Sequence, residues 1–175
     1  MLERQVAPAS RRCYAPTKIM PAVDTTLYRR NLPHLRIEGA VYFLTWRLRP
    51  RVPELTPAER NRVMAALRHF DGERYRLDAF VVMNDHVHVL VRPADNVLLR
   101  AIVHSWKSFT AKEIQRCRGL RGPLWLDEYF DRVPRDDREY AEKRDYILNN
   151  PFRRWPDIDG YDWVWAEGLE KPGHP

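Results

Sequence analysis

The run Leu77-Asp-Ala-Phe-Val-Val-Met83, Asn84-Asp85, His86-Val-His-Val-Leu-Val-Arg92 decides the fold. Two segments rich in β-branched and apolar residues flank two polar ones, which is the pattern of a β-hairpin with a tight turn. In the second segment alternate side chains leave opposite faces, so the three valines point one way and His86 and His88 the other. The hairpin therefore predicts two imidazoles side by side on one surface of a sheet.

The elements on either side of this hairpin give the fold class. Aromatic and β-branched residues predict a strand over 41–48, and two short apolar runs predict a bent strand within 124–133. Apolar residues at helical spacing predict helices over 56–70 and from about 96 to 117. The order is β-α-β-β-α-β, an α+β ferredoxin-like arrangement in which two helices cover one face of a four-stranded antiparallel sheet and the other face is free.

Helix boundaries follow from capping and breaking residues. Thr56-Pro57-Ala58-Glu59 has the pattern of a capping box with proline in the first turn, and Asp95 or Asn96 is the expected cap of the second helix. An additional C-terminal helix is predicted from Asp136-Asp137 to about Asn149. Pro151 is expected to limit it, because the residue before a proline avoids helical torsions.

The chain is expected to form one domain with two tails. Residues 1–24 lack periodicity and contain three prolines, so we expect a disordered N-terminal tail, and Met20 is an alternative start to Met1. Residues 25–155 hold all predicted strands and helices. Residues 156–175 are expected to be irregular chain that packs back onto the domain.

Composition favours a polyanionic partner. Lys and Arg total 30 against 24 acidic residues, a formal net charge of +6, which predicts a basic surface suited to nucleic acid. Two cysteines suggest neither a disulfide framework nor a zinc knuckle. No apolar run approaches the roughly 20 residues of a membrane helix. We therefore expect a cytoplasmic, nucleoid-associated protein with no membrane partner.

Tyr146 and Asn150 are the second pair of chemical interest. They are four residues apart in the predicted C-terminal helix, so the phenol and the amide face the same side. The spacing alone is also typical of a tyrosine that merely packs its ring. In the same way, His86 and His88 taken alone are also typical of a surface pair on a half-exposed strand.

Three motifs together resemble a known family. They are Met83-Asn-Asp-His-Val-His88, Trp125 with Tyr129-Phe-Asp-Arg132, and Tyr146-Ile-Leu-Asn-Asn-Pro151. In this order and spacing they resemble the REP-associated tyrosine transposases, a group of the single-tyrosine HUH transposases in the IS200-like superfamily. The resemblance spans roughly Tyr28 to Trp155.

The resemblance implies a role for each matching residue. Tyr146 would be the nucleophile, and His86, His88 and Asn150 would bind a divalent metal. Tyr28, Arg29 and Arg30 would help to grip the DNA, and Lys107 is expected to meet the phosphate backbone. The implied substrate is single-stranded or hairpin DNA of the REP-like palindromic kind, and the oligomeric state is left open between monomer and homodimer.

The donor types agree with this chemistry. Two imidazoles and one amide oxygen with open positions suit Mg²⁺ or Mn²⁺, and a metal held by neutral ligands keeps its charge for the phosphate. Attack by a tyrosine would store the phosphodiester bond as a 5′-phosphotyrosine, so a second strand end can reverse the step. The expected activity is therefore DNA nicking and strand transfer.

Two rival functions stay open. One is a non-catalytic module that holds single-stranded nucleic acid on its free sheet face. The other is a metal-dependent phosphodiesterase in which water attacks. Tyr129 and Tyr140 compete as nucleophiles, although neither is followed four residues later by an asparagine or glutamine. Four tryptophans are candidates for base stacking, and one of them, Trp106, is expected in the core: Trp46, Trp106, Trp125 and Trp155.

Overall fold

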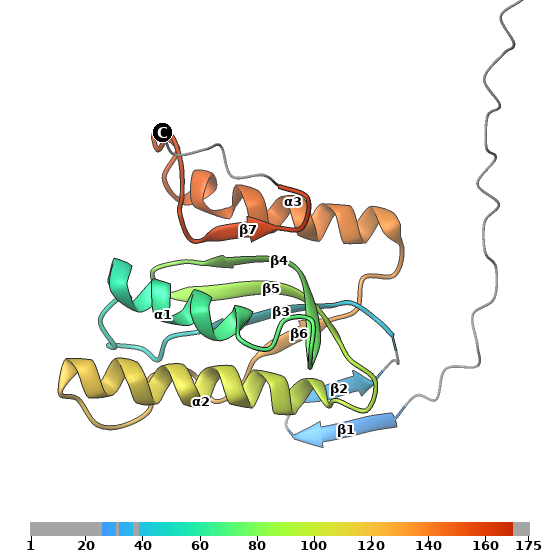
Figure 1. The fold of residues 1–175 in the computed structure, drawn as a ribbon, viewed down its shortest axis with the longest axis horizontal. Coiled ribbons are helices and arrows are strands. Elements are labelled where there is room, and N and C mark those ends of the chain that lie inside the picture. The colour runs from blue at the N-terminus through green and yellow to red at the C-terminus, as the bar shows by residue number, and fades with distance from the viewer. Residues whose placement is uncertain (1–25, 31, 37–38, 170–175) are drawn as a thin grey trace, which may run out of the picture.

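The computed structural model, drawn as a ribbon in Figure 1, describes residues 26–30, 32–36 and 39–169. The predicted N-terminal tail, 1–24, lies outside these residues. Strands β1 (Thr26–Arg30) and β2 (Leu32–Arg36) pair with each other as a separate antiparallel hairpin. No described helix is both long enough and apolar enough to span a membrane.

A five-stranded antiparallel sheet forms the centre of the molecule, in the order β6-β3-β5-β4-β7. The strands are β3 (Tyr42–Arg47), β4 (Tyr75–Val82), β5 (His86–Pro93), β6 (Phe130–Arg132) and β7 (Val164–Ala166). The first four follow the predicted β-α-β-β-α-β order, with helices α1 (Pro57–Arg68) and α2 (Leu99–Arg118) as the crossovers. The ferredoxin-like α+β fold is therefore confirmed.

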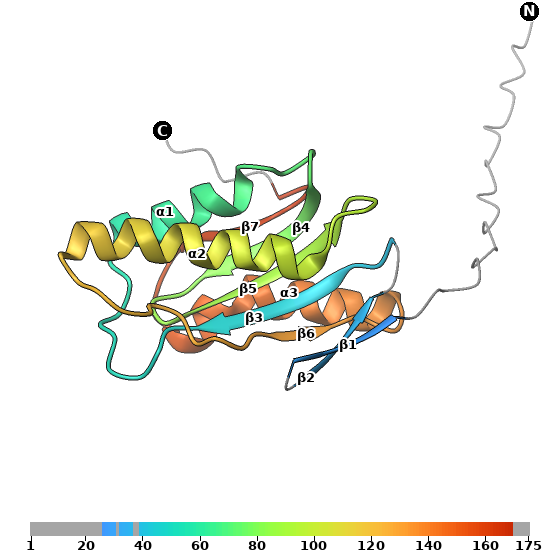
Figure 2. The ribbon, with the colours of Figure 1, turned by 90° about the horizontal axis from the view of Figure 1, so that it is seen from below.

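The two faces of the sheet carry different helices. Helices α1 and α2 pack on one face, where Val87, Val89 and Val91 join the larger hydrophobic core. Helix α3 (Asp137–Arg154) lies across the other face (Figures 1 and 2), where Ile147 packs with Leu90. The prediction of a free second face is wrong, because the C-terminal helix has its own apolar side and buries it there.

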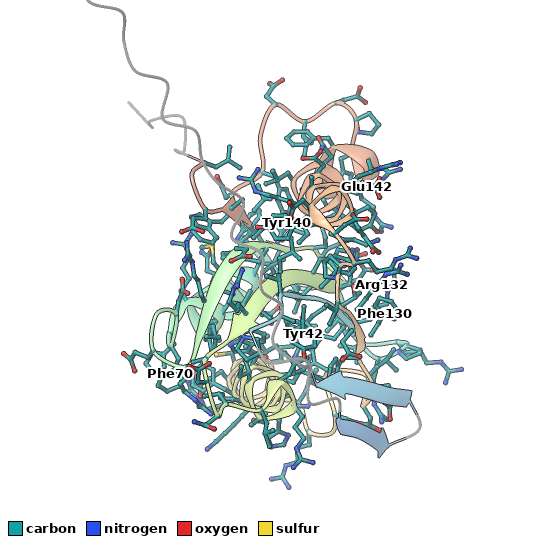
Figure 3. All side chains as sticks on the ribbon, turned by 90° about the vertical axis from the view of Figure 1, so that its right-hand side faces the viewer. Tyr42, Phe70, Phe130, Arg132, Tyr140 and Glu142 are labelled. Carbon is teal, nitrogen blue, oxygen red and sulfur yellow. The ribbon has the colours of Figure 1, made fainter. Side chains whose placement is uncertain are left out.

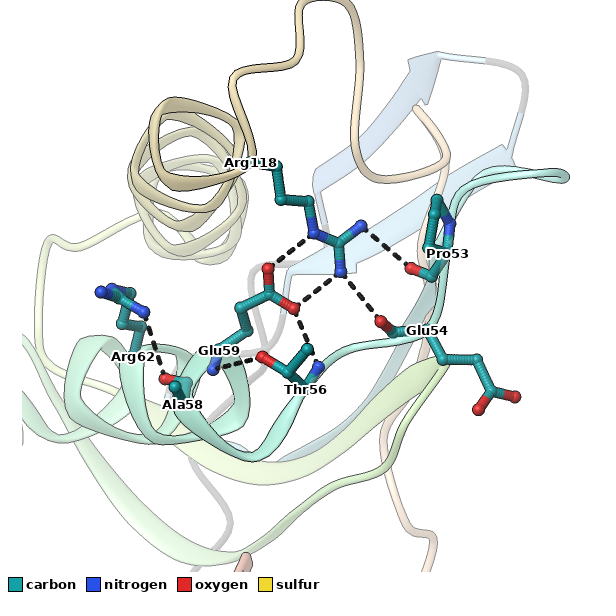
Figure 4. Close-up of polar contacts among 7 residues, drawn as sticks. All are labelled: Pro53, Glu54, Thr56, Ala58, Glu59, Arg62 and Arg118. Atoms are coloured by element: carbon teal, nitrogen blue, oxygen red, sulfur yellow. Dashed lines mark hydrogen bonds and ion pairs between the residues drawn. The ribbon is translucent and has the colours of Figure 1, made fainter.

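Helix α1 begins with the predicted capping box, which also fastens α1 to α2. Thr56 Oγ1 accepts from the backbone N–H of Glu59, whose carboxylate accepts from the N–H of Thr56. The same carboxylate accepts hydrogen bonds from both the Nε and an Nη of Arg118 at the end of α2 (Figure 4). Arg118 also donates to the carbonyls of Pro53 and Glu54, so one buried ion pair joins two helices and the loop before α1.

The start of α2 and the end of α3 differ from the predicted positions. Helix α2 begins at Leu99 with Leu98 as an N-cap that makes no side-chain bond, so neither Asp95 nor Asn96 caps it. Asn96 adopts a left-handed φ of 63° in the preceding turn. Helix α3 continues through Pro151 to Arg154. Pro151 has no backbone N–H to donate to the helix. Burial of Ile147, Asn150 and Pro151 on the sheet-facing side stabilises the helix at this position.

The described part of the segment after α3, up to residue 169, contains a strand and is therefore not wholly irregular. Val164–Ala166 form β7, which pairs with the edge of β4. The guanidinium of Arg60 lies 3.6 Å from the centre of the Trp163 ring and donates to the hydroxyl of Tyr161. Strand pairing and a cation–π contact therefore hold this segment against β4 and α1.

Candidate active site

His86 and His88 lie on the sheet face that α3 covers, with ring centroids 4.7 Å apart. Their exposed fractions are 7% and 4%. Leu90, the next residue on this face, packs in the cluster beneath α3, whereas the valines between them pack beneath α1 and α2. The predicted alternation of β5 is confirmed, and the histidines are buried rather than spread on an open surface.

Each imidazole is held through its Nδ1 atom. Asp85 Oδ1 lies 2.6 Å from His86 Nδ1, and Thr45 Oγ1 lies 2.7 Å from His88 Nδ1. Such contacts fix the ring orientation and leave Nε2 to bind a metal. His88 Nε2 is buried and has no hydrogen-bond partner among the described residues. An unpartnered nitrogen in this position fits a metal ligand.

The electrostatics of His88 suit the same role. Burial lowers its pKa to about 3, with smaller contributions from His86 and from the positive charge of Arg47. The ring is therefore neutral at physiological pH, and its Nε2 lone pair is available to a cation.

Tyr146 is brought to the histidines by α3. Its ring meets that of His88 edge to face, with centroids 5.1 Å apart. Phe43 on β3 completes the group, since it stacks on His88 at 5.5 Å and meets Tyr146 at 6.1 Å. Tyr146 remains 37% exposed. The tyrosine therefore lies beside a buried imidazole and is still accessible to a large substrate.

Asn150 follows one helical turn after Tyr146 and is 8% exposed on the sheet-facing side of α3. Nowhere in the described chain do three or more His, Cys, Asp or Glu side chains gather as a metal site. A metal at the histidine pair would therefore need a ligand of another type. The amide of Asn150, on the helix that carries Tyr146, has the right chemistry for Mg²⁺ or Mn²⁺.

Three cationic side chains surround this group, and the sequence analysis missed them. The Arg153 guanidinium lies 5.6 Å from the centre of the Tyr146 ring, and Lys143 Nζ lies 5.3 Å from that of Phe43. Arg47 on β3 is the cross-strand partner of His86. Arg153 follows Tyr146 by seven residues, and Lys143 precedes it by three. This helical spacing could have predicted that both lie on the same side of the helix as Tyr146.

The rival tyrosines occupy other environments. Tyr129 packs against the core on the α1 and α2 side, and burial raises the pKa of its hydroxyl. The Tyr140 hydroxyl donates to Asp78 Oδ2 at 3.1 Å, and its pKa is also raised by burial. Of the three candidate nucleophiles, Tyr146 is the one whose ring meets His88.

The other predicted DNA contacts are Lys107 and three residues near the N-terminus. Lys107 lies on α2, on the other side of the sheet, where Nζ donates to the carbonyl of Asp127. The described backbone of β1 contains Tyr28, Arg29 and Arg30, whose side chains lie outside what the structure describes. The prediction that Trp46 and Trp125 stack on bases is wrong. Both rings are buried in the core with Trp106.

Comparison with known proteins agrees with this geometry. The family model described as "Transposase IS200 like" matches residues 37–150. An Escherichia coli K12 REP-associated tyrosine transposase is 24% identical over 134 residues, covering 74% of this chain and 77% of that protein. A Haemophilus influenzae protein provisionally named as a REP-associated tyrosine transposase is 26% identical over 139 residues, covering 72% of this chain and 76% of its own length.

A solved structure of a REP-associated tyrosine transposase bound to a REP hairpin has the same fold, with a TM-score of 0.59. It is 20% identical and covers 79% of this chain and 81% of that one. The resemblance read from the three sequence motifs is thereby confirmed. Because the family model matches residues 37–150, more than half of the chain, the chain belongs to the IS200-like transposase family.

Proposed function

We propose that this protein cuts and rejoins single-stranded DNA beside a hairpin, with Tyr146 as the nucleophile. The observation that carries the proposal is the contact between Tyr146 and His88, whose ring centroids lie 5.1 Å apart on one face of the sheet. A phenol next to two oriented imidazoles suits metal-assisted phosphoryl transfer with tyrosine as the nucleophile.

The reaction begins when the Tyr146 oxygen attacks the phosphorus of the scissile phosphodiester. The new bond is a phosphotyrosine on the 5′ side, and the bond that breaks is that to the 3′ oxygen, which leaves as a hydroxyl. A 3′ hydroxyl of another strand end can then attack the phosphotyrosine and restore a phosphodiester. The step conserves the bond energy and so supports strand transfer rather than hydrolysis.

His86, His88 and Asn150 would hold the metal, and bound Mg²⁺ or Mn²⁺ would polarise the phosphate and stabilise its developing charge. The protein itself contributes orientation and charge. Asp85 and Thr45 fix the imidazole rings. Arg153 supplies a positive charge beside the Tyr146 ring.

The substrate class rests on the relatives. Two curated relatives are REP-associated tyrosine transposases by name, and the structural neighbour was solved with a REP hairpin. A net charge of +6 agrees with a DNA partner in the cell. We therefore propose palindromic hairpin DNA with a single-stranded flank as the substrate.

The rival module that binds nucleic acid without cutting it has less support. Its bases would stack on the second sheet face, which α3 covers in this structure. Phe43, the aromatic residue of β3 on that face, is 6% exposed and packs against both His88 and Tyr146. Such a face offers little aromatic surface for a base.

The test is to incubate the protein with Mg²⁺ or Mn²⁺ and a labelled hairpin that has a single-stranded flank, then to look for an adduct that survives denaturation. We expect a covalent adduct, and Tyr146→Phe should abolish both the adduct and cleavage. Cleavage that survives this substitution would favour the hydrolase, and tight binding with neither product would favour the module.

A further inference from the structure

A bulge in β4 turns a carboxylate toward the helix that carries Tyr146. The register between β4 and β5 shifts between Leu77 and Ala79, so Asp78 is an extra residue on the β4 side of the pairing. Consecutive residues of a regular strand face opposite sides of the sheet, whereas a bulge lets two neighbours face the same side. Ala79 packs in the cluster beneath α3, and the Asp78 carboxylate also contacts α3.

The residue of α3 that meets this carboxylate is Tyr140. Its hydroxyl donates to Asp78 Oδ2 at 3.1 Å, and Figure 3 shows Tyr140 between α3 and the sheet. Asp78 is only 5% exposed. Burial raises the pKa of Asp78, while the Tyr140 hydroxyl and the positive charge of Arg92 act in the opposite direction. A buried carboxyl depends on its hydrogen-bond donor, so this contact is a specific link between α3 and β4.

The link restrains a motion that apolar packing leaves less restricted. Ile147 is fully buried in the cluster beneath α3 and keeps the helix against the sheet. Burial of apolar surface is not directional, whereas a hydrogen bond prefers one geometry. Tyr140 precedes Ile147 by seven residues, roughly two helical turns, so both lie on the same side of α3. Together they fix the rotation of the helix about its own axis.

This rotation decides where the phenol of Tyr146 lies. Tyr146 precedes Ile147 by one residue, so its side chain leaves the helix roughly 100° around the axis, at the rim of the contact with the sheet. A side-chain atom roughly 6 Å from the axis moves by about 1 Å when the helix turns by about 10°. A displacement of about 1 Å at a reacting group can slow a reaction about 100-fold.

We propose that Asp78 and Tyr140 are a positioning pair for the nucleophile. Their hydrogen bond sets the rotation of α3 and thereby the position of Tyr146 beside His88. Neither residue touches the DNA in this role, because both act through the helix. The inference rests on the proposed function, since it concerns the tyrosine that is the nucleophile there.

Three substitutions and one matched control test the pair. Tyr140→Phe removes the hydroxyl and keeps the ring, Asp78→Leu removes the acceptor, and Asp78→Asn keeps an acceptor oxygen. Tyr161→Phe is the control. The Tyr161 hydroxyl also donates to β4, at the carbonyl of Val82, but Tyr161 lies on the segment after α3. Melting curves establish that each variant folds, and Tyr140→Phe carries the test if Asp78→Leu does not fold.

The first readout needs no DNA. Fluorotyrosine is incorporated in place of Tyr146, and its fluorine NMR resonance reports the surroundings of the ring beside His88. We expect Tyr140→Phe and Asp78→Leu to broaden this resonance or move it toward that of the free amino acid. Asp78→Asn and Tyr161→Phe should leave it in place. An unchanged resonance in Tyr140→Phe would overturn the proposal.

The second readout is the rate of adduct formation at saturating hairpin DNA, measured beside hairpin affinity. We expect Tyr140→Phe and Asp78→Leu to slow the adduct about tenfold and to leave affinity unchanged. Asp78→Asn should restore most of the rate. Equal slowing by Tyr140→Phe and Tyr161→Phe, or a shifted resonance with an unchanged rate, would overturn the positioning role. A wild-type chain that forms no adduct would refute the proposed function alone, because the fluorine resonance is measured without DNA.

Discussion

Tyr146 on α3 and His88 on β5 meet edge to face, with ring centroids 5.1 Å apart and ring planes at 74°. The helix is anchored by the residue that follows the tyrosine, because Ile147 is fully buried against the sheet. Tyr146 itself lies at the rim and is 37% exposed. A rigid anchor thus holds an accessible phenol beside a buried imidazole.

The histidine pair should be required for cleavage but not for DNA affinity. We expect His86→Ala or His88→Ala to slow cleavage by at least about 100-fold, because each change removes a metal ligand. Hairpin affinity, measured by anisotropy, should stay close to that of wild type. His69→Ala is the control, since His69 is exposed and lies beside Phe70 away from the site. A loss of affinity equal to the loss of cleavage would argue against the metal assignment.

Thr45 should tune metal affinity through His88. Thr45→Val keeps the side-chain shape and removes the hydroxyl that lies 2.7 Å from His88 Nδ1. We expect Mn²⁺ affinity, measured by titration calorimetry, to fall about 10- to 100-fold. Thr45→Ser keeps the hydroxyl and should bind Mn²⁺ nearly as wild type does. Cleavage by Thr45→Val should recover at higher Mn²⁺ concentration. A cleavage defect that does not change with Mn²⁺ concentration would contradict this role.

Arg153 should assist the attack by Tyr146. Its guanidinium lies 5.6 Å from the centre of the Tyr146 ring, and we expect this charge to stabilise the negative charge that develops on a phosphate attacked by Tyr146. We expect Arg153→Gln to slow adduct formation about tenfold at saturating DNA. Arg138→Gln removes an equal charge from α3, where Arg138 pairs with Glu142, and should change the rate little. Equal effects of the two substitutions would indicate a general charge effect.

The Glu59–Arg118 ion pair should stabilise the fold in a pH-dependent way. The hydrogen bonds from Arg118 hold the pKa of Glu59 below its usual value. A carboxyl with a lowered folded-state pKa stabilises the native state above its unfolded pKa, and this contribution is lost as pH falls through the folded value. We expect Glu59→Gln to cost about 3 kcal/mol at pH 7, because it leaves Arg118 without its buried partner.

Thermal unfolding at neutral and acidic pH checks this prediction. The difference between wild type and Glu59→Gln should narrow as pH falls below about 4, since wild type then loses the same charge. Glu113→Gln breaks an exposed pair with Arg116 and should leave the stability close to that of wild type. A Glu59→Gln deficit that is the same at both pH values would contradict an ionic origin.

Local patterns made much of the fold and part of the site predictable. The alternation of β5 placed His86 and His88 on one face, and the Thr56–Glu59 capping box marked the start of α1. Helical spacing put Tyr146 and Asn150 on one side of α3. Each of these relationships links residues within a few positions, so backbone geometry alone fixes it.

What the sequence by itself determined was therefore the order of strands and helices and the side of each element on which a residue lies. Tertiary structure alone decided that α3 covers the histidine face, that it continues through Pro151, that β7 extends the sheet, and that Thr45 holds His88. These features depend on contacts between segments far apart in the chain. Their stability comes from burial and pairing that exist only after the chain has folded.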